Sequence, residues 1–147
     1  MIPLAVLLGK AARFVLRLRG GGSAVPGRVA MLISPKFLQK TLGRLNRGIY
    51  FVSGSNGKST TTSMLVRILR EHGLKVLSNP AGGNLPQGLA SALLAEVNWR
   101  GKLSHDVAVL EVDEAYGKLI AAEVAPNGLL LTNLQLDQLN RFHSPED

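Results

Sequence analysis

The segment from Tyr50 to Thr62, YFVSGSNGKSTTT, combines glycines, a lysine and hydroxyl side chains at a spacing that suits phosphate binding. Gly54 and Gly57 permit a tight turn, and the run that begins at Lys58 is expected to open a helix. Backbone N–H groups of the loop and of the first helical turn would then point at one anion, and the Lys58 ammonium would reach a terminal phosphate. The segment therefore predicts a nucleotide phosphate site.

The spacing of this loop departs from the usual GxxxxGK[ST] pattern, because that pattern requires a glycine at position 52 and this chain has Val52. A glycine-rich turn before a helix, without any ligand, is the alternative interpretation. The strand-like residues before the loop and the helical spacing of apolar residues after it favour nucleotide binding. A hydroxyl group of Ser59 or Thr60 is then expected to bind Mg²⁺ that arrives with the nucleotide.

The residues around the loop alternate between strand-like and helix-like patterns from residue 48 onward. Strands are expected near 48–53, 74–78, 106–112 and 128–132. Helices are expected near 58–72, 85–97 and 114–123. This order predicts an α/β fold with a mostly parallel sheet and helices on its faces.

Ligands of such sheets bind beyond the carboxyl ends of the strands, so the loop after each strand is a candidate site. These loops are 79–84, Glu111 to Glu114 and 132–138. If its strand lies beside the first one, Glu111 is favoured as a magnesium ligand, with capping of the next helix as the alternative. Capping is favoured for Glu114. Asp137 is equally suited to a ligand and to a turn.

Length and composition describe a folded chain of 147 residues with one expected domain, since 46% of the residues are hydrophobic and 18% are charged. The chain has no cysteine, so it can form neither a disulfide nor a cysteine zinc site. His72, His105 and His143 show no metal-ligand spacing and are interpreted as surface or capping residues.

Charge is unevenly distributed along the chain. Residues 1–50 hold nine Lys/Arg and no Asp or Glu, whereas residues 51–147 hold eight Lys/Arg and ten Asp/Glu. A basic front segment suits a membrane surface, an anionic substrate or nucleic acid. Nucleic acid is the weakest of the three, because the chain contains no recognised nucleic-acid-binding motif.

Residues 2–18 form an apolar helical pattern in which Lys10, Arg13 and Arg17 share one side. The pattern is too interrupted to span a bilayer, and it suits either a helix on the cytoplasmic leaflet or a helix packed on protein. Glycines 20–22 are expected to end this helix and 24–27 to continue as a turn. A short helix is expected from Pro35, capped by Ser34. Residues 1–47 are thus a basic N-terminal segment, and residues 48–147 form the nucleotide-binding domain.

Four segments together are similar to the central ATP-binding domain of the Mur ligase family: GSNGKST, the GGN at 82–84, the LEVDE that contains Glu111, and NLQLDQLNRF from residue 133. GGGSAVPGRVA and NPAGGNLPQGLASALL resemble the branch of this family that amidates lipid II. The resemblance implies an ATP-dependent carbon–nitrogen ligase of peptidoglycan synthesis. Such a ligase activates the D-glutamate α-carboxylate of lipid II for amidation to D-isoglutamine, with ammonia from a GatD-like glutaminase subunit. It would work in the cytoplasm, with the inner membrane face as an option.

The resemblance also implies roles for individual residues. The ATP phosphates would lie against Gly54, Ser55, Asn56, Gly57, Lys58, Ser59 and Thr60. Magnesium would be bound by Ser59 or Thr60 and organised by Glu111. Asn84, Asp137 and Gln138 are substrate-side candidates, and Gln138 stands where many Mur ligases carry histidine, as in the amidating branch. No residue that activates ammonia is identifiable.

The resemblance further implies that the chain is truncated before the rest of the central domain, a cysteine zinc ribbon and a C-terminal domain. Zinc is expected only in that downstream region, and the 147 residues alone are expected to be inactive. The alternatives are an amino-acid-adding Mur ligase or folylpolyglutamate synthase relative, and a non-catalytic ATP-binding fragment.

Overall fold

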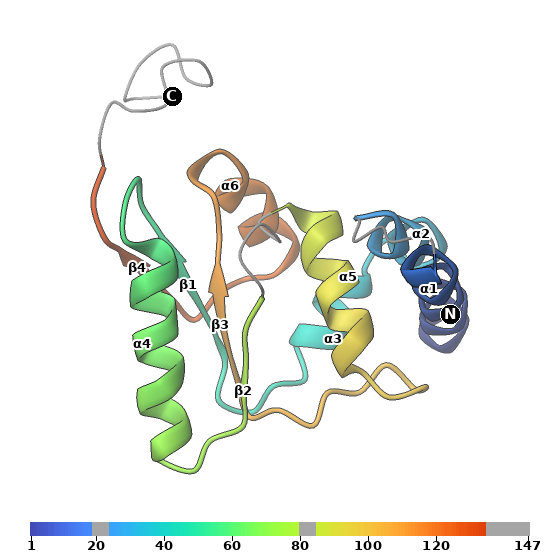
Figure 1. The fold of residues 1–147 in the computed structure, drawn as a ribbon, viewed down its shortest axis with the longest axis horizontal. Coiled ribbons are helices and arrows are strands. Elements are labelled where there is room, and N and C mark those ends of the chain that lie inside the picture. Colours follow the sequence, from blue (N-terminus) through green and yellow to red (C-terminus); the bar gives the residue numbers. More distant parts are fainter. Residues whose placement is uncertain (19–23, 80–84, 135–147) are drawn as a thin grey trace.

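The computed structural model describes residues 1–18, 24–79 and 85–134 of the chain. The elements follow one another in an order that becomes a strand–helix alternation from β1 onward (Figure 1). They are α1 (Ile2–Leu18), α2 (Val25–Ile33), α3 (Phe37–Leu42), β1 (Ile49–Ser53), α4 (Lys58–Glu71), β2 (Val76–Leu77), α5 (Pro86–Glu96), β3 (Val107–Glu111), α6 (Glu114–Glu123) and β4 (Gly128–Leu131).

The strands form one parallel sheet in the order β2-β3-β1-β4. In β1, Val52 is in register with Glu111 of β3, and Ser53 is in register with Leu131 of β4. The predicted α/β fold with a parallel sheet and flanking helices is confirmed. Because β1 lies between β3 and β4, the loops that follow these three strands emerge at the same edge of the sheet.

The two faces of the sheet carry separate cores, as the alternation of side chains along a strand requires. In β3, Val107 and Val109 pack with Val66 of α4 on one face. Ala108 and Leu110 face the larger core on the other side, which α3, α5 and α6 cover (Figure 1). α4 is thereby held against the sheet directly behind the loop from which it starts.

The N-terminal helices pack on α5 through two glycines. A Cβ at Gly9 would lie 2.6 Å from Leu94 Cδ1, and one at Gly27 would lie 2.0 Å from Gln87 O. The Gly27 N–H also donates a hydrogen bond to Ser91 Oγ at 2.7 Å. Residues of α1, α2 and α3 therefore belong to the same large core as β1 and β3, and a domain division at residue 47 stays a prediction.

The prediction of a turn over residues 24–27 is wrong, because α2 begins at Val25. Pro26 lies in the first helical turn, where its missing N–H costs no hydrogen bond, and Gly27 permits the close approach to α5. The expected role of Ser34 is also wrong. Ser34 ends α2, and α3 starts only at Phe37, whose N–H donates to Ser34 O at 2.8 Å.

The second strand is shorter than expected, since pairing is confined to Val76 and Leu77. Beyond Leu77, the side chain of Asn79 takes the place of backbone atoms in the hydrogen bonds to β3, as described below. Within the described ranges no helix is long and apolar enough to cross a membrane.

Candidate phosphate-binding site

The loop between β1 and α4 ends in a left-handed residue that opens the helix. Gly57, with φ of 82°, is the N-cap residue of α4, and no side chain caps this end. The first hydrogen bond of the helix runs from Thr61 N–H to Gly57 O at 2.9 Å. The amides of the first turn, from Lys58 to Thr60, have no intrahelical acceptor, so they and the positive end of the helix dipole can bind an anion.

Lys58 folds back over the loop instead of extending into solvent. Its Nζ donates to Gly54 O and lies 3.4 Å from Ser55 O. The side chain is half-buried, whereas Ser59 and Thr60 are exposed at the same helix end. A cationic group, the first-turn amides of a helix and two hydroxyl groups thus meet at one point, which is the chemistry that a nucleotide phosphate with its Mg²⁺ requires.

Gly54 allows the loop after β4 to press against the phosphate loop. Its φ is 133°, in a region that residues with a side chain rarely adopt. A Cβ at this position would lie 2.2 Å from Thr132 Oγ1 and 2.8 Å from Asn133 O. Glycine is therefore required here both by the backbone conformation and by the space available.

Thr132 and Asn133 brace the phosphate loop from the end of β4. The Ser55 N–H donates to Asn133 O at 3.0 Å, and the Asn56 N–H donates to Asn133 Oδ1 at 2.9 Å. In return, Asn133 Nδ2 and Thr132 Oγ1 donate to Asn56 O at 3.1 and 2.7 Å. The brace uses the amides of Ser55 and Asn56, so an anion is expected to meet the first turn of α4 rather than these two amides.

Glu111 ends β3 beside the strand that carries the phosphate loop. It is 7% exposed, and its backbone is clamped by Asn79, which follows β2. The Glu111 N–H donates to Asn79 Oδ1 and Asn79 Nδ2 donates to Glu111 O, each at 2.8 Å. Asn79 thereby continues the sheet pairing with its side chain. The clamp uses only backbone atoms of Glu111, so the carboxylate is left for a cation.

The segment after Glu111 is fixed to β1 as well. The Val112 N–H donates to Val52 O at 3.0 Å, and Ser53 Oγ donates to Val112 O at 3.1 Å. The Asp113 carbonyl then accepts hydrogen bonds from Tyr116 and Gly117, which lie in the first turn of α6. The sheet register and these contacts hold Glu111 at the edge from which the phosphate loop emerges.

Comparison with known proteins identifies the family of the chain. The sequence profile of the Mur ligase middle domain matches residues 52–147. The chain belongs to the Mur ligase family. The predicted family resemblance is therefore confirmed.

The relatives of this Mur ligase chain include enzymes of two kinds. It is 39% identical over 139 residues to the lipid II isoglutaminyl synthase subunit MurT of Streptococcus pneumoniae, covering 95% of this chain. It is 32% identical to MurT of Staphylococcus aureus, covering 96% of this chain. The UDP-N-acetylmuramate–L-alanine ligase of Rhodococcus opacus is 39% identical over 95 residues, covering 65% of this chain and 17% of that ligase. The chain spans about 30% of the length of the MurT relatives.

A solved Mur ligase shares the fold. The crystal structure of MurF from Acinetobacter baumannii aligns with a TM-score of 0.61 at 23% identity, covering 80% of this chain and 25% of that chain. At this identity the likeness concerns the fold alone.

The structure of this Mur ligase chain brings together the phosphate loop, Lys58, Ser59, Thr60 and Glu111 at one sheet edge. Asn84, Asp137 and Gln138 lie outside the described residues, so their predicted roles stay predictions. Among the described residues, no three His, Asp, Glu or Cys side chains form a cluster that could hold a metal ion. A nucleotide phosphate would have to complete the magnesium ligands.

Sequence reasoning named the loops that contain Asn79, Thr132 and Asn133 but gave these residues no individual role. Each acts through hydrogen bonds to a strand or loop that is distant in sequence. Asparagine two residues after a strand is the signal that could have found Asn79 and Asn133, since its side chain can both donate and accept like a peptide group.

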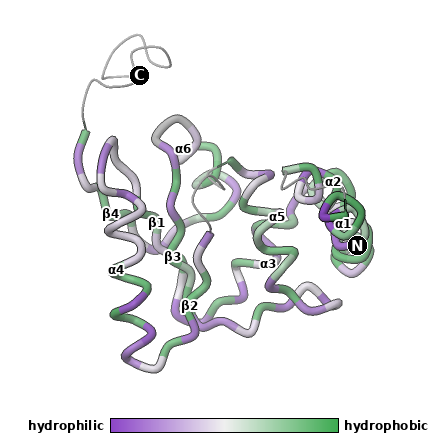
Figure 2. Tube along the Cα trace, viewed as in Figure 1, coloured by the Kyte–Doolittle hydropathy of each residue, from purple (hydrophilic) through white to green (hydrophobic). Residues whose placement is uncertain are grey.

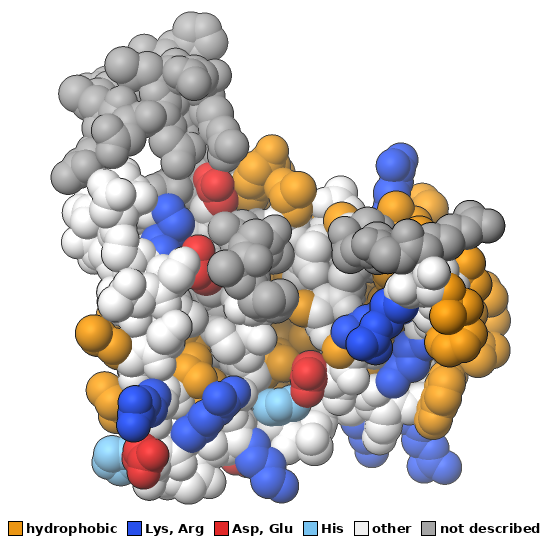
Figure 3. Space-filling view, viewed as in Figure 1, with side chains coloured by type: hydrophobic (Ala, Val, Ile, Leu, Met, Phe, Trp, Pro, Cys, Tyr) orange, Lys and Arg blue, Asp and Glu red, His pale blue; other side chains and the backbone are white. Residues whose placement is uncertain are grey.

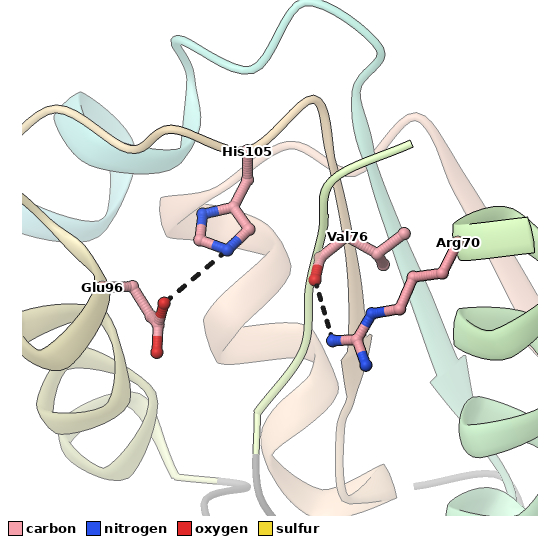
Figure 4. Close-up of polar contacts among 4 residues, drawn as sticks. All are labelled: Arg70, Val76, Glu96 and His105. Carbon is pink, nitrogen blue, oxygen red and sulfur yellow. Dashed lines mark hydrogen bonds and ion pairs between the residues drawn. The ribbon is translucent and has the colours of Figure 1, made fainter. Parts of the chain in front are cut away.

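The histidines of the described chain lie away from the phosphate loop. His72 Nδ1 lies 2.8 Å from Ile68 O at the end of α4, which agrees with the predicted capping role. His105 precedes β3 at the opposite sheet edge and faces Glu96, with 3.6 Å between Nε2 and Oε2 (Figure 4). The side chain of His105 is 16% exposed, so this residue lies only partly at the surface, and its interpretation as a surface or capping residue stays a prediction.

Arg70 closes the same edge from α4, with a hydrogen bond of 3.3 Å from Nη2 to Val76 O (Figure 4). These contacts are structural: they join α4, β2 and α5 at the end of the sheet that lies away from the phosphate loop.

Proposed function

We propose that this chain is the ATP-binding part of a MurT-like ligase, which activates the D-glutamate α-carboxylate of lipid II for amidation. The coverage of the relatives carries this proposal. The likeness to MurT extends over 95% of the chain and so includes the N-terminal helices, whereas the likeness to the L-alanine ligase covers 65%. The phosphate loop at α4 supplies the ATP site that such a ligase needs.

In the proposed reaction, the γ-phosphoryl group of ATP is transferred to the α-carboxylate, which gives an acyl phosphate and ADP. Ammonia then attacks the carbonyl carbon and phosphate leaves, so the product is a carboxamide. The part of this chain is to hold the phosphates. The first-turn amides of α4 bind their oxygens, and the Lys58 ammonium offsets the charge that develops on the transferred group.

Magnesium fits the residues at this edge. Ser59 and Thr60 present hydroxyl oxygens at the start of α4, and Glu111 presents a carboxylate beside β1. Hard oxygen ligands of this kind suit Mg²⁺ that is shared with phosphate oxygens. The ion would neutralise phosphate charge and orient the γ-phosphoryl group.

The proposed partner is a GatD-like glutaminase that supplies ammonia, and the proposed place of work is the cytoplasm, where ATP and glutamine are present. The partner is proposed from the names of the MurT relatives, which describe a glutamine-hydrolysing synthase subunit. In open water ammonia would be protonated or diffuse away, and the acyl phosphate would be hydrolysed, so delivery within a complex protects the intermediate.

A chimeric enzyme tests the proposal. The segment of this chain that aligns with Streptococcus pneumoniae MurT, at 39% identity over 139 residues, would replace the corresponding segment of that protein. The chimera, its glutaminase, lipid II, glutamine, ATP and Mg²⁺ are expected to yield amidated lipid II by mass spectrometry. The same chimera with Lys58→Ala is the control for catalysis by the loop. A folded chimera that binds ATP but gives no carboxamide would contradict the proposal.

An amino-acid-adding ligase is the second candidate, since the L-alanine ligase matches the nucleotide-binding part of the chain. The two functions differ in the nucleophile, which is ammonia in the first and L-alanine in the second. If the chimera consumed ATP with UDP-N-acetylmuramate and L-alanine rather than with lipid II and glutamine, the second candidate would replace the first.

A further inference from the structure

α1 has two apolar faces, and only one of them is packed on the protein. The buried positions Ile2, Ala5, Val6 and Gly9 follow helical spacing and face the rest of the domain. Apolar side chains also occupy the outer face, with exposures between 43% and 73%. This outer face consists of Leu4, Leu7, Leu8, Phe14, Val15 and Leu18. An exposed face of this kind is unusual for a helix that meets only water.

The outer face cannot turn inward without disrupting the core. Gly9 lies so close to Leu94 of α5 that a Cβ would be 2.6 Å from Leu94 Cδ1. A Cβ at Gly101 would likewise be 2.1 Å from Ile2 Cγ2, at the other end of the packed face. These two close approaches fix the rotation of α1, so its outer face remains a continuous apolar ridge at the end of the molecule farthest from α4 (Figures 1 and 3).

Basic residues border this ridge, and acidic residues do not. Arg17 is the one charged residue among the exposed positions of α1. The whole chain has no Asp or Glu before Glu71, while residues 1–50 hold nine Lys/Arg. The tube in Figure 2 shows α1 and α2 as largely hydrophobic, and Figure 3 shows Lys and Arg side chains beside the apolar patch. The chemistry is that of a helix which lies on an anionic lipid surface.

Trp99 stands at the margin of α1 and provides a further interfacial group. Lys10 Nζ donates to Val97 O at 2.8 Å and lies 5.1 Å from the centre of the Trp99 ring. The indole is nevertheless 63% exposed. Tryptophan prefers the boundary between lipid and water, because its ring is apolar and its N–H is polar.

We infer that the outer face of α1 docks on an anionic lipid surface, with Arg17 and the other basic residues of the N-terminal helices at the headgroups. A lipid surface is favoured over a protein partner by the composition of the face. Protein interfaces as a whole are only about as apolar as other surfaces, whereas the exposed part of α1 carries no polar side chain except Arg17. The inference rests on α1 and stands independently of the proposed ligase reaction.

Vesicle binding tests this docking directly. Trp99 is the single tryptophan of the chain, so its emission reports on the margin of α1 alone. The whole 147-residue chain is titrated with vesicles of phosphatidylglycerol and phosphatidylcholine, and separately with pure phosphatidylcholine vesicles. We expect a blue shift of Trp99 emission and co-sedimentation with the anionic vesicles, and much weaker binding to the neutral ones, with added salt weakening the former.

Two triple variants test whether vesicle binding depends on the ridge or on exposed apolar side chains in general. Leu7→Gln, Phe14→Gln and Leu18→Gln are expected to weaken vesicle binding by roughly a hundredfold, because three side chains lose their burial in lipid. Met64→Gln, Ile68→Gln and Leu119→Gln, on α4 and α6, remove apolar groups that are 61%, 54% and 57% exposed, and binding is expected to stay unchanged. Arg17→Gln is expected to weaken binding to anionic vesicles by roughly fivefold.

Four results would overturn the inference. The ridge variant could bind as well as the wild type, or the wild type could bind neutral and anionic vesicles equally. Sedimentation equilibrium could show a wild-type dimer that dissociates in the ridge variant, with no vesicle binding, and the face would then be an interface between two copies. The full-length MurT chimera could fail to bind vesicles that the 147-residue chain binds, and another part of the longer protein would then cover α1.

Discussion

Asn133 holds Asn56 by both polar atoms of its side chain, from the loop after β4, 77 residues further along the chain. Oδ1 accepts from the Asn56 N–H at 2.9 Å, and Nδ2 donates to Asn56 O at 3.1 Å. The pair fixes the middle of the phosphate loop before any ligand arrives. Since ordering a loop costs free energy, a loop that is already fixed binds its anion more tightly.

Replacing Asn133 tests this role in two steps. Asn133→Ala removes both hydrogen bonds, and we expect it to destabilise the fold by about 1–2 kcal/mol and to speed hydrogen exchange of the Asn56 amide. Asn133→Asp retains the acceptor for Asn56 N–H but places an oxygen opposite Asn56 O. The Asn56 amide should therefore stay more protected in Asn133→Asp than in Asn133→Ala. Equal exchange rates in the wild type and Asn133→Ala would show that the contact does not order the loop.

Local signals in the sequence revealed the elements of this site, but not the contacts that hold it. Gly57 and Lys58 mark the loop by residue type, and the helix from Lys58 starts where the pattern predicts. The partners of Asn56 and Glu111, by contrast, depend on the strand order β2-β3-β1-β4. Nothing in the spacing of residues along one chain fixes that order.

The missed helix α2 shows a different limit. Pro26 and Gly27 are turn residues by propensity, so the pattern predicts a turn. In the folded chain Pro26 occupies a first-turn position, and Gly27 is needed because α2 approaches the backbone of α5. Packing against a distant helix thus outweighs local propensity.

Gly54 and Gly73 allow a comparison of two left-handed glycines. A Cβ at Gly73 meets nothing within 4 Å, so Gly73→Ala should cost only the backbone strain of about 1 kcal/mol. Gly54→Ala adds a collision with Thr132 Oγ1 and should destabilise the protein by about 3 kcal/mol or more. Urea denaturation of both variants measures the difference. If Gly54→Ala and Gly73→Ala lower the free energy of unfolding equally, the loop after β4 does not press on Gly54 in solution.

Variants of Asn79 and Glu111 are expected to differ in their effects, since one should lower stability and the other should weaken metal binding. Asn79→Ala leaves the buried N–H and C=O of Glu111 without partners, which should lower the free energy of unfolding by about 2–4 kcal/mol. Glu111→Gln keeps the backbone clamp and should leave stability nearly unchanged, while it weakens the Mg²⁺ dependence of ATP binding. Denaturation and calorimetry with and without Mg²⁺ measure the two effects. An unchanged Mg²⁺ dependence in Glu111→Gln would remove Glu111 from the proposed metal site.

Lys58 is the residue on which nucleotide affinity should depend most. Its ammonium is already held over the loop by Gly54 O and Ser55 O, so little reordering is needed when a phosphate binds. Lys58→Ala removes a charge-assisted contact, and we expect ATP–Mg²⁺ affinity to fall by about 1.5–3 kcal/mol. Lys75→Ala is the matched control, because it removes one exposed lysine next to β2, at the opposite edge of the sheet. Isothermal titration calorimetry should show a loss in Lys58→Ala and none in Lys75→Ala. Equal losses in the two variants would mean that ATP affinity depends only on the net charge of the chain. Equal affinity in the wild type and Lys58→Ala would show that phosphate does not bind at this loop.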